Sequence, residues 1–310
     1  MSGFALPTRL DGAELAIETR SLVKRFDGTD ALRGLDLQVP AGAVYVLAGP
    51  NGSGKSTAIK VLLDVVRADH GTARVLGIDT TADPALARAQ IGYVPEKSET
   101  GYDSLSVERF LRHHAAFFET WDPGYAALLC RRLKVPLGAD LRDLSKGALR
   151  SVILVTALAH RPPVLLLDEP TDGLDPLARE ELMALLADHM ADSPTTLLWS
   201  THHVNEVERM ADHVGVLRNG RLVLQAPRDQ VRLRLRRYRA GVPEGWTGAP
   251  GLNGQVLLRE GEGRETALTV WGEERDIVER LAATGATVHD AAPLSLEEAT
   301  VALLRAGGAT

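Results

Sequence analysis

The sequence predicts an α/β fold built around a parallel β-sheet. Short apolar runs at 43–48, 164–167 and 195–199 have the composition of buried strands. The first run leads through a glycine-rich loop into an amphipathic helix, and a helix predicted at 176–190 separates the other two. Because buried strands that alternate with helices form parallel βαβ units, these segments predict the core of the fold.

Further elements follow from local signals along the chain. Apolar residues that alternate or cluster predict strands at 13–18 and 35–39. Asn219-Gly220 is a strong two-residue hairpin signal and lies between strands predicted at 213–217 and 221–225.

The chain from about 98 to 160 has a helical pattern. Asp122-Pro123 is typical of a helix cap followed by a proline in the first turn. The apolar residues expected on one helix face are Val107, Phe110, Leu111 and Phe118.

The composition changes after Pro227, where six arginines occur between residues 228 and 239 and a glycine- and proline-rich stretch covers 241–254. We therefore predict one domain at 14–226 and a second at 227–310. The second domain is expected to be a small α/β appendage, with strands at 267–270 and 286–289 and helices at 273–284 and 295–305.

Residues 231–236 alternate strictly between apolar residues and arginine, which predicts a strand with three arginines on one face. That face is interpreted as solvated. Two alternatives remain open: a patch for anionic lipid headgroups or an acidic partner, and a nucleic-acid surface. Nucleic-acid binding is not expected, because no aromatic platform or known nucleic-acid motif accompanies the arginines.

Composition excludes several broad classes. The 310 residues carry a formal net charge of −6, unlike a strongly basic nucleic-acid binder. Cys130 is the only cysteine, so no intrachain disulfide can form and a reducing compartment is expected. We see no secretory signal and no apolar stretch near the roughly 20 residues that span a bilayer. A role in membrane transport would need another chain to form the pore.

A phosphate-binding loop is predicted directly after the first buried strand. Residues 49–56 fit the pattern G-x-x-x-x-G-K-[ST]. The glycines let successive backbone N–H groups turn toward one anion, and the following helix adds the positive end of its dipole. Lys55 is expected to reach nucleotide phosphates and Ser56 to hold Mg²⁺. The candidate binding residues are Gly49, Pro50, Asn51, Gly52, Ser53, Gly54, Lys55, Ser56 and Thr57.

Two carboxylates end the buried strand at 164–167. Asp168 and Glu169 are therefore expected at the carboxyl edge of the sheet, where ligands bind in α/β folds. Asp168 can bind Mg²⁺ directly or through water. Glu169 can accept a proton from an attacking water and is the candidate general base.

Together these segments resemble the motifs of the ABC transporter ATPases, in their order and approximate spacing. After the loop GPNGSGKST come Ile91-Gly92-Tyr93-Val94-Pro95-Glu96 and Leu144-Ser145-Lys146-Gly147-Ala148. LLLDEP, Gly173-Leu174-Asp175-Pro176 and Ser200-Thr201-His202 follow. The resemblance covers roughly residues 14 to 226. It implies a P-loop NTPase core with a mixed sheet, an antiparallel β subdomain and a helical signature subdomain.

The resemblance also implies roles for individual residues. Phe26 corresponds to the aromatic residue that stacks on adenine, and His202 to the switch histidine that contacts the γ-phosphate. Ser145 and Gly147 correspond to the signature loop, which contacts ATP bound by a partner subunit, and Asp175 to the turn that links the two sites. Neighbouring His203 is expected to point elsewhere.

Two positions depart from the family pattern. Glu96 stands where Gln is common, on a loop that touches Mg²⁺ and water and faces the membrane subunit. The signature loop reads LSKGA rather than LSGGQ, so Lys146 and Ala148 are unusual, while Ser145 and Gly147 are kept. Both departures resemble a subset of bacterial exporters that pair a soluble subunit with a separate permease.

The resulting hypothesis is a cytoplasmic ATPase on the inner face of the cell membrane. It binds two MgATP in a head-to-tail dimer, for which a homodimer is the simpler expectation, and drives a permease. The alternative is a soluble ABC ATPase that acts on ribosomes or DNA. A GTPase or kinase that shares only the phosphate loop is disfavoured, because N-K-x-D is absent and the signature loop would be unexplained.

Overall fold

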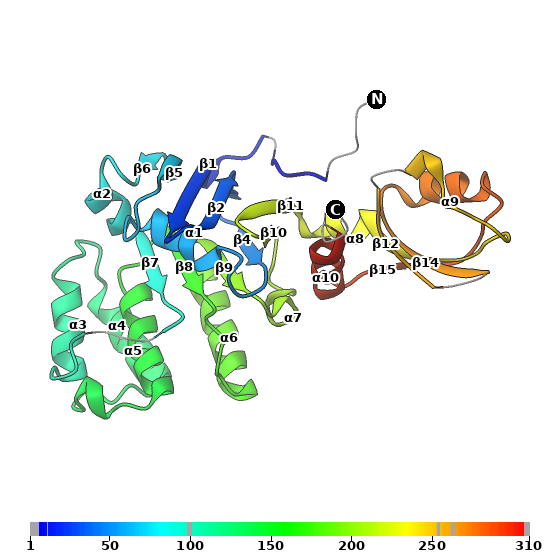
Figure 1. The fold of residues 1–310 in the computed structure, drawn as a ribbon. Coiled ribbons are helices and arrows are strands. Elements are labelled where there is room, and N and C mark those ends of the chain that lie inside the picture. The colour runs from blue at the N-terminus through cyan, green and yellow to red at the C-terminus, as the bar shows by residue number, and fades with distance from the viewer. Residues whose placement is uncertain (1–5, 11, 98–100, 253–254, 262–263, 307–310) are drawn as a thin grey trace.

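The computed structural model describes residues 6–10, 12–97, 101–252, 255–261 and 264–306. At its centre lies a six-stranded sheet with the order β11-β10-β4-β9-β8-β7 (Figure 1). All of its strands except the edge strand β11 are parallel. The strands are β4 (Val44–Ala48), β7 (Ile91–Val94), β8 (Val164–Asp168), β9 (Thr196–Thr201), β10 (His213–Arg218) and β11 (Arg221–Pro227).

An antiparallel sheet forms a second layer and has the order β2-β1-β5-β6, with β3 also paired to β1. Helix α1 (Lys55–Leu62) packs between the two sheets, where Ile59 and Leu62 share one core cluster with residues of both. The strands of the second sheet are β1 (Leu15–Phe26), β2 (Thr29–Leu35), β3 (Gln38–Pro40), β5 (His70–Val75) and β6 (Ile78–Asp79). Helix α2 (Pro84–Ala89) follows β6.

The hairpin predicted at Asn219-Gly220 is present, whereas the single strand predicted at 35–39 is not. Asn219 and Gly220 both have positive φ, of 48° and 75°, which confirms the tight hairpin between β10 and β11. The single strand predicted at 35–39 is wrong, because β2 ends at Leu35 and β3 begins at Gln38. Side chains take the backbone hydrogen bonds at this break: Asp36 accepts from the N–H of Ser21, and Leu37 donates to Thr19 Oγ1.

The region predicted to be helical contains α3 (Val107–Ala115), α4 (Pro123–Arg132), the short 3₁₀ helix η1 (Leu141–Asp143) and α5 (Lys146–Leu158). Asp122 caps α4 by accepting from the N–H of Tyr125, as predicted. The placement of Phe118 with Val107 on one helix face is wrong, because α3 ends at Ala115. Phe118 instead stacks on His160, with ring centroids 3.9 Å apart.

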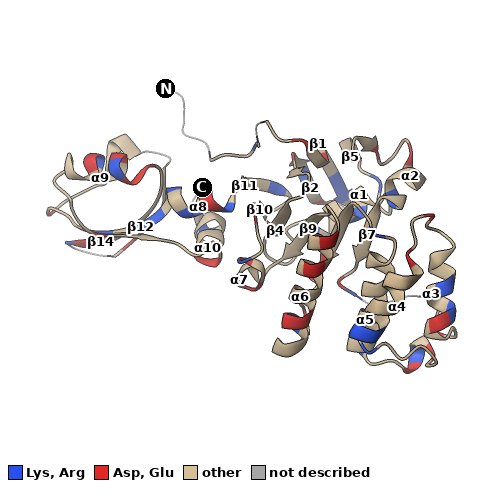
Figure 2. Cartoon of the chain, turned by 180° about the vertical axis from the view of Figure 1, so that it is seen from behind, with Lys and Arg blue, Asp and Glu red and all other residues tan. Residues whose placement is uncertain are grey.

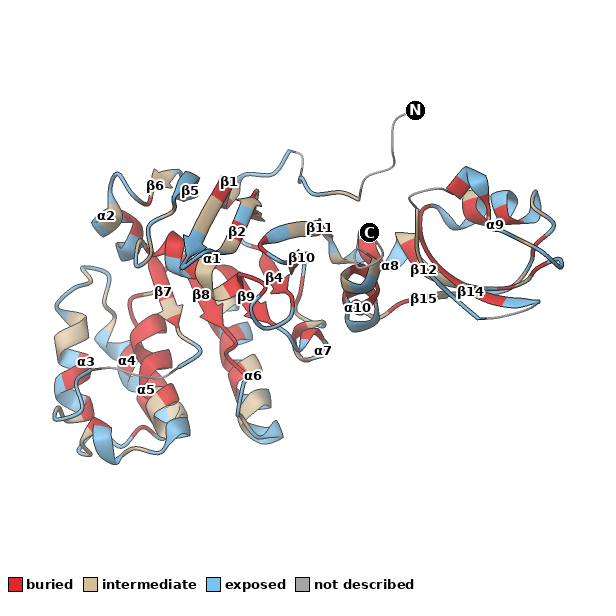
Figure 3. Cartoon of the chain, viewed as in Figure 1, coloured by how far each residue is buried: buried red, intermediate tan, exposed pale blue. Residues whose placement is uncertain are grey.

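The main core lies on the face of the six-stranded sheet opposite α1. Helices α5 and α6 (Pro176–Asp192) cover that face together with the short α7 (Val204–Val207). Buried residues follow these strands and the inner side of α5 (Figure 3). No helix among the described residues is long and apolar enough to cross a membrane.

The C-terminal region forms an antiparallel sheet with the order β13-β14-β12-β15 and its own apolar cluster, which includes Tyr238, Leu268, Ile277 and Leu281 (Figure 1). Its elements are α8 (Arg228–Arg234), β12 (Leu235–Gly241), η2 (Pro250–Leu252), β13 (Val256–Glu260), β14 (Glu265–Trp271), α9 (Glu274–Ala282), β15 (Thr287–Pro293) and α10 (Leu296–Ala306).

Helix α10 packs against the main core rather than the C-terminal cluster. Its residues Leu296 and Leu303 belong to the same cluster as Val207 of α7. The N–H of Leu296 donates to Glu208 Oε1 at 3.2 Å, just after α7. Helix α10 therefore completes the core that surrounds the six-stranded sheet.

The strand predicted at residues 231–236 is wrong, because the chain is helical to Arg234 and β12 begins at Leu235. Val231 and Leu235 are buried, whereas Leu233 is 65% exposed. Residues four positions apart lie on the same face of a helix. A short strict alternation also places apolar residues four positions apart, so the pattern fits both a strand and a helix.

Because this stretch is divided between α8 and β12, its arginines do not lie on one face of a strand. Figure 2 marks lysine and arginine positions on these two elements in blue. Two of them pair with acids of neighbouring elements, Arg234 with Glu273 at 2.7 Å and Arg236 with Glu274 at 3.1 Å. Arg237, directly after the stretch, pairs with Glu298 at 3.5 Å.

Candidate active site

The glycine-rich loop joins β4 to α1, and its glycines are required by close packing. A Cβ at Gly49 would collide with the carbonyl oxygen of Leu217. Gly54 has a φ of 110°, and a Cβ there would lie 2.5 Å from the carbonyl oxygen of Ala31. The buried Oγ of Ser53 has no hydrogen-bond partner among the described residues, as expected of a group that serves a ligand.

Lys55, in the first turn of α1, is only 5% exposed. Its Nζ donates to the carbonyl oxygens of Gly49 at 2.8 Å and Pro50 at 3.3 Å. It also forms an ion pair with Glu169 Oε1 at 3.1 Å. A buried ammonium needs such oxygen partners, and phosphate oxygens can replace them.

Asp168, at the end of β8, collects hydroxyl groups from two other elements. Its Oδ1 accepts from Ser56 Oγ of α1 at 3.1 Å and from Ser200 Oγ of β9. The carboxylate is 2% exposed. Converging carboxylate and hydroxyl oxygens are the ligand type that Mg²⁺ prefers, so these residues fit that ion.

Glu169 follows Asp168 with a left-handed backbone, at a φ of 45°. Its Oε2 lies 3.0 Å from His202 Nδ1 and accepts from the His202 N–H at 3.2 Å. A non-glycine residue in this conformation stores strain that the surrounding structure must stabilise, and such residues cluster at functional sites. The carboxylate thus lies between Lys55 and His202.

The prediction that His203 points elsewhere than His202 is wrong. The two rings lie 3.8 Å apart between centroids and are tilted by 43°. Because β9 ends at Thr201, side chains no longer alternate between the two faces of the sheet at these positions.

A cleft of about 450 Å³ adjoins these groups. Its lining comprises Thr29, Asp30, Ala31, Asn51, Gly52, Gly54, Lys55, Ser56, Thr57, Glu96 and Glu169. Glu96 enters the cleft just after β7. Burial, reinforced by the charges of Asp168 and Glu96, raises the pKa of nearby Tyr93 to about 12. Phe26 is not part of this lining. It is 43% exposed at the end of β1 and pairs with Thr29, a residue that does line the cleft.

Ser145, Gly147 and Asp175 lie outside the cleft. Ser145 caps α5 by accepting from the N–H of Ala148, and Asp175 caps α6 by accepting from the N–H of Ala178. Gly147 lines a separate hollow of about 160 Å³ between α5 and α6. Within one chain, therefore, the structure gathers the phosphate loop, Glu96, Asp168, Glu169 and His202 but leaves the signature residues apart.

Comparisons with known proteins agree with this geometry. The family model described as ABC transporter matches residues 32–172, and one described as AAA domain, putative AbiEii toxin, Type IV TA system, matches residues 138–208. The ABC transporter ATP-binding protein YtrB of Bacillus subtilis is 32% identical over 206 residues, which cover 66% of this chain and 70% of YtrB. The chain belongs to the ABC transporter ATP-binding family. It is accordingly an ABC ATPase that binds nucleotide.

Other relatives of this ABC ATPase carry names of transport systems. The daunorubicin/doxorubicin resistance ATP-binding protein DrrA of Streptomyces peucetius is 36% identical over 68% of this chain, but the match spans only 64% of DrrA. Nod factor export ATP-binding protein I of Rhizobium meliloti is 34% identical over 72% of this chain and 68% of its own length. A solved ATP-binding subunit of an ABC transporter superposes with a TM-score of 0.65 at 29% identity, covering 71% of this chain and 92% of that subunit.

Two arginines that contact the loop after Glu169 were missed from the sequence. Arg150 of α5 donates to the carbonyl oxygens of Glu169 and Asp172. Arg179 of α6 donates to the carbonyl oxygen of Leu174 at 3.4 Å and pairs with Glu206 of α7 at 2.7 Å. Ser200, which donates to Asp168, was also missed. The only sequence signal for Arg150 was its position, a charged residue just before the apolar stretch of α5.

Proposed function

We propose that this ABC ATPase is the MgATP-hydrolysing subunit of a membrane exporter. One observation carries the proposal: Lys55, Glu169 and His202 contact one another through the Glu169 carboxylate, at the carboxyl edge of a parallel sheet. A cation for phosphate, a carboxylate base and a histidine are thus placed together, beside the hydroxyl and carboxylate of Ser56 and Asp168.

Each residue has a distinct role in this proposal. The loop N–H groups and the α1 dipole bind the phosphates, and Lys55 exchanges its carbonyl and carboxylate partners for phosphate oxygens. Glu169, released from Lys55, accepts a proton from the attacking water, and His202 orients the γ-phosphate. Mg²⁺, held by Ser56 and Asp168 with Glu96 nearby, would supply positive charge that offsets the charge developing on the phosphates.

A second copy of the chain completes the site in this proposal. Ser145 and Gly147 lie outside the cleft of their own chain, at the N-terminus of α5, where backbone N–H groups favour an anion. A head-to-tail homodimer would bring them to the γ-phosphate of the partner, with Asp175 linking the two sites. Two ATP molecules would then be enclosed, and hydrolysis would release the contact.

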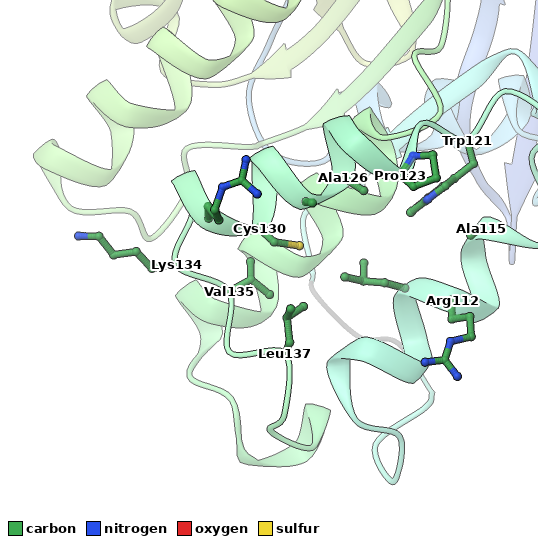
Figure 4. A pocket seen from close by; sticks show the side chains of 12 residues that line it. Arg112, Ala115, Trp121, Pro123, Ala126, Cys130, Lys134, Val135 and Leu137 are labelled. Atoms are coloured by element: carbon green, nitrogen blue, oxygen red, sulfur yellow. The ribbon is translucent and has the colours of Figure 1, made fainter.

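A groove in the helical region is suited to a permease segment (Figure 4). It has a volume of about 610 Å³ and an apolar floor between α3 and α4 that includes Leu111, Trp121, Cys130, Val135 and Leu137. Among the described residues, its lining includes the cations Arg112, Arg131 and Lys134 and no acid. We propose that an apolar, acid-flanked cytoplasmic segment of the permease binds here and holds the ATPase on the inner face of the membrane.

The direction of transport and the roles of the two domains are also part of the proposed function. Export is inferred from relatives named for export and drug resistance. Residues 14–226 are assigned to ATP binding and 227–310 to an accessory domain, although its α10 helix packs on the main core.

The test is co-purification from detergent-solubilised membranes in MgATP, with tagged Glu169→Gln protein that retains ATP. A polytopic membrane protein is the expected partner. An Arg131→Glu/Lys134→Glu variant should lose that partner while still binding ATP. The matched control, Arg142→Glu, changes an exposed arginine of the helical region outside the groove and should keep it. Recovery of ribosomes or DNA instead would favour the soluble ABC ATPase.

A further inference from the structure

Arg150 is a buried arginine whose charge no carboxylate neutralises directly. It is 7% exposed, and among the described residues no acid lies within ion-pair distance of its guanidinium. Its Nη2 donates to the carbonyl oxygen of Glu169 at 2.8 Å and its Nη1 to that of Asp172 at 2.7 Å. The buried Nε has no hydrogen-bond partner within the part of the chain that the structure describes. Burial lowers the pKa of Arg150, with Asp172 and Glu96 opposing that effect.

Burying a guanidinium is costly unless its N–H groups are hydrogen-bonded, so the two carbonyl contacts are needed to hold Arg150 in this position. The two carbonyl groups that Arg150 binds flank the tight turn after β8, in which the N–H of Asp172 donates to the Glu169 carbonyl oxygen at 3.1 Å. This turn begins with the left-handed residue Glu169. A planar guanidinium presents its N–H donors in a rigid fork and so fixes the relative positions of both carbonyl oxygens, whereas the donors of an ammonium group rotate freely on a flexible stem.

We propose that Arg150 is a positioning residue for ATP hydrolysis. It holds the backbone of Glu169 in the strained conformation that aims the carboxylate between Lys55 and His202. It does so from α5, the helix that Ser145 caps and whose first turn contains Gly147. The contact between the signature end of α5 and a second copy is thereby linked to the orientation of the base. This inference rests on the proposed role of Glu169.

The test is a double-mutant cycle between position 150 and Glu169, with kcat and KM for ATP measured separately. Arg150→Lys and Arg150→Gln should each lower kcat by about 10- to 100-fold, because displacing a catalytic group by about 1 Å has effects of that size. KM and nucleotide affinity should change less than threefold. In the Glu169→Gln background, the same substitutions should have no further effect on kcat.

Arg88→Gln is the matched control, since Arg88 also donates to a backbone carbonyl oxygen, that of Leu63, away from the site. It should leave kcat unchanged. Thermal melting of each variant shows that the fold is kept, and Arg150→Lys decides the test if Arg150→Gln does not fold.

Two results would overturn the positioning role and leave the assignment of Glu169 as the base intact. One is a normal kcat in both Arg150 variants, and the other is a loss of kcat that multiplies with the loss caused by Glu169→Gln. Normal turnover in Glu169→Gln would instead refute the base and, with it, the positioning role.

Discussion

The ATP-binding region and the C-terminal region place their charges differently. Around the six-stranded sheet, Lys55, Asp168, Glu169 and Arg150 are each no more than 7% exposed. In the C-terminal region, the side chains of Arg234 and Arg237 are 41% and 38% exposed and pair with acids that are exposed as well. Burial of charge costs several kcal/mol per group, whereas exposed pairs cost and contribute little. The buried charges are therefore the ones that indicate function.

The largest expected effect is on the buried carboxylate. Glu169→Gln should lower kcat by about 10²- to 10⁴-fold, because the amide cannot accept the proton of the attacking water. Steady-state phosphate release measures this loss. Glu180→Gln, on the exposed side of α6, should retain normal turnover. Equal rates for the two variants would contradict the assignment of the base.

Acid should lower the free energy of unfolding of the ATP-binding region, the second-largest effect expected. His189 is buried beside Tyr125, whose Oη lies 2.9 Å from its Nδ1, and burial lowers the pKa of His189 from 6.5 to about 4. The unfolded chain therefore binds a proton more readily than the folded chain between these values. Stability is fully present above pH 6.5 and falls as the pH approaches 4, by up to about 3 kcal/mol.

Urea unfolding at pH 7.5, 6 and 5 measures this dependence. A His189→Gln variant should show a shallower dependence on pH than the original chain, and identical slopes would contradict the prediction. The C-terminal region should be less sensitive, because the histidines with a lowered pKa among the described residues all precede it: His114, His160, His189 and His213.

The smallest effect is expected in the C-terminal region. Arg234→Ala removes the exposed pair with Glu273 and should lower the free energy of unfolding by about 0–1 kcal/mol. ATPase activity should not change. Leu235→Ala, at the neighbouring fully buried position, should cost about 2–5 kcal/mol. An Arg234 effect as large as that of Leu235 would show that charges in this region also matter to the fold.

The sequence predicts best where structure depends on neighbouring residues. The glycines at 49 and 54 are needed for close approach and for a positive φ, so the loop could be recognised from its own residues. The apolar strand before Asp168 likewise places that carboxylate at the sheet edge without knowledge of any distant segment.

The sequence predicts poorly where partners are remote or the pattern is short. Arg150 binds backbone carbonyl groups, which carry no side-chain signal, of a turn that lies beyond the end of its helix. Six alternating residues at 231–236 fit strand spacing, yet burial of Val231 and Leu235 also fits a helix. A longer segment would have separated the two periods.

Helix α10 has a consequence for the order in which the chain can fold. It adds Leu296, Ala299, Ala302 and Leu303 to the core that contains Val204 and Val207, so that core is discontinuous in sequence. During synthesis, the ATP-binding region has an uncovered apolar surface until residues near 300 leave the ribosome. A chain cut at the composition change near residue 227 would keep every nucleotide-binding motif and still present that surface to chaperones and proteases.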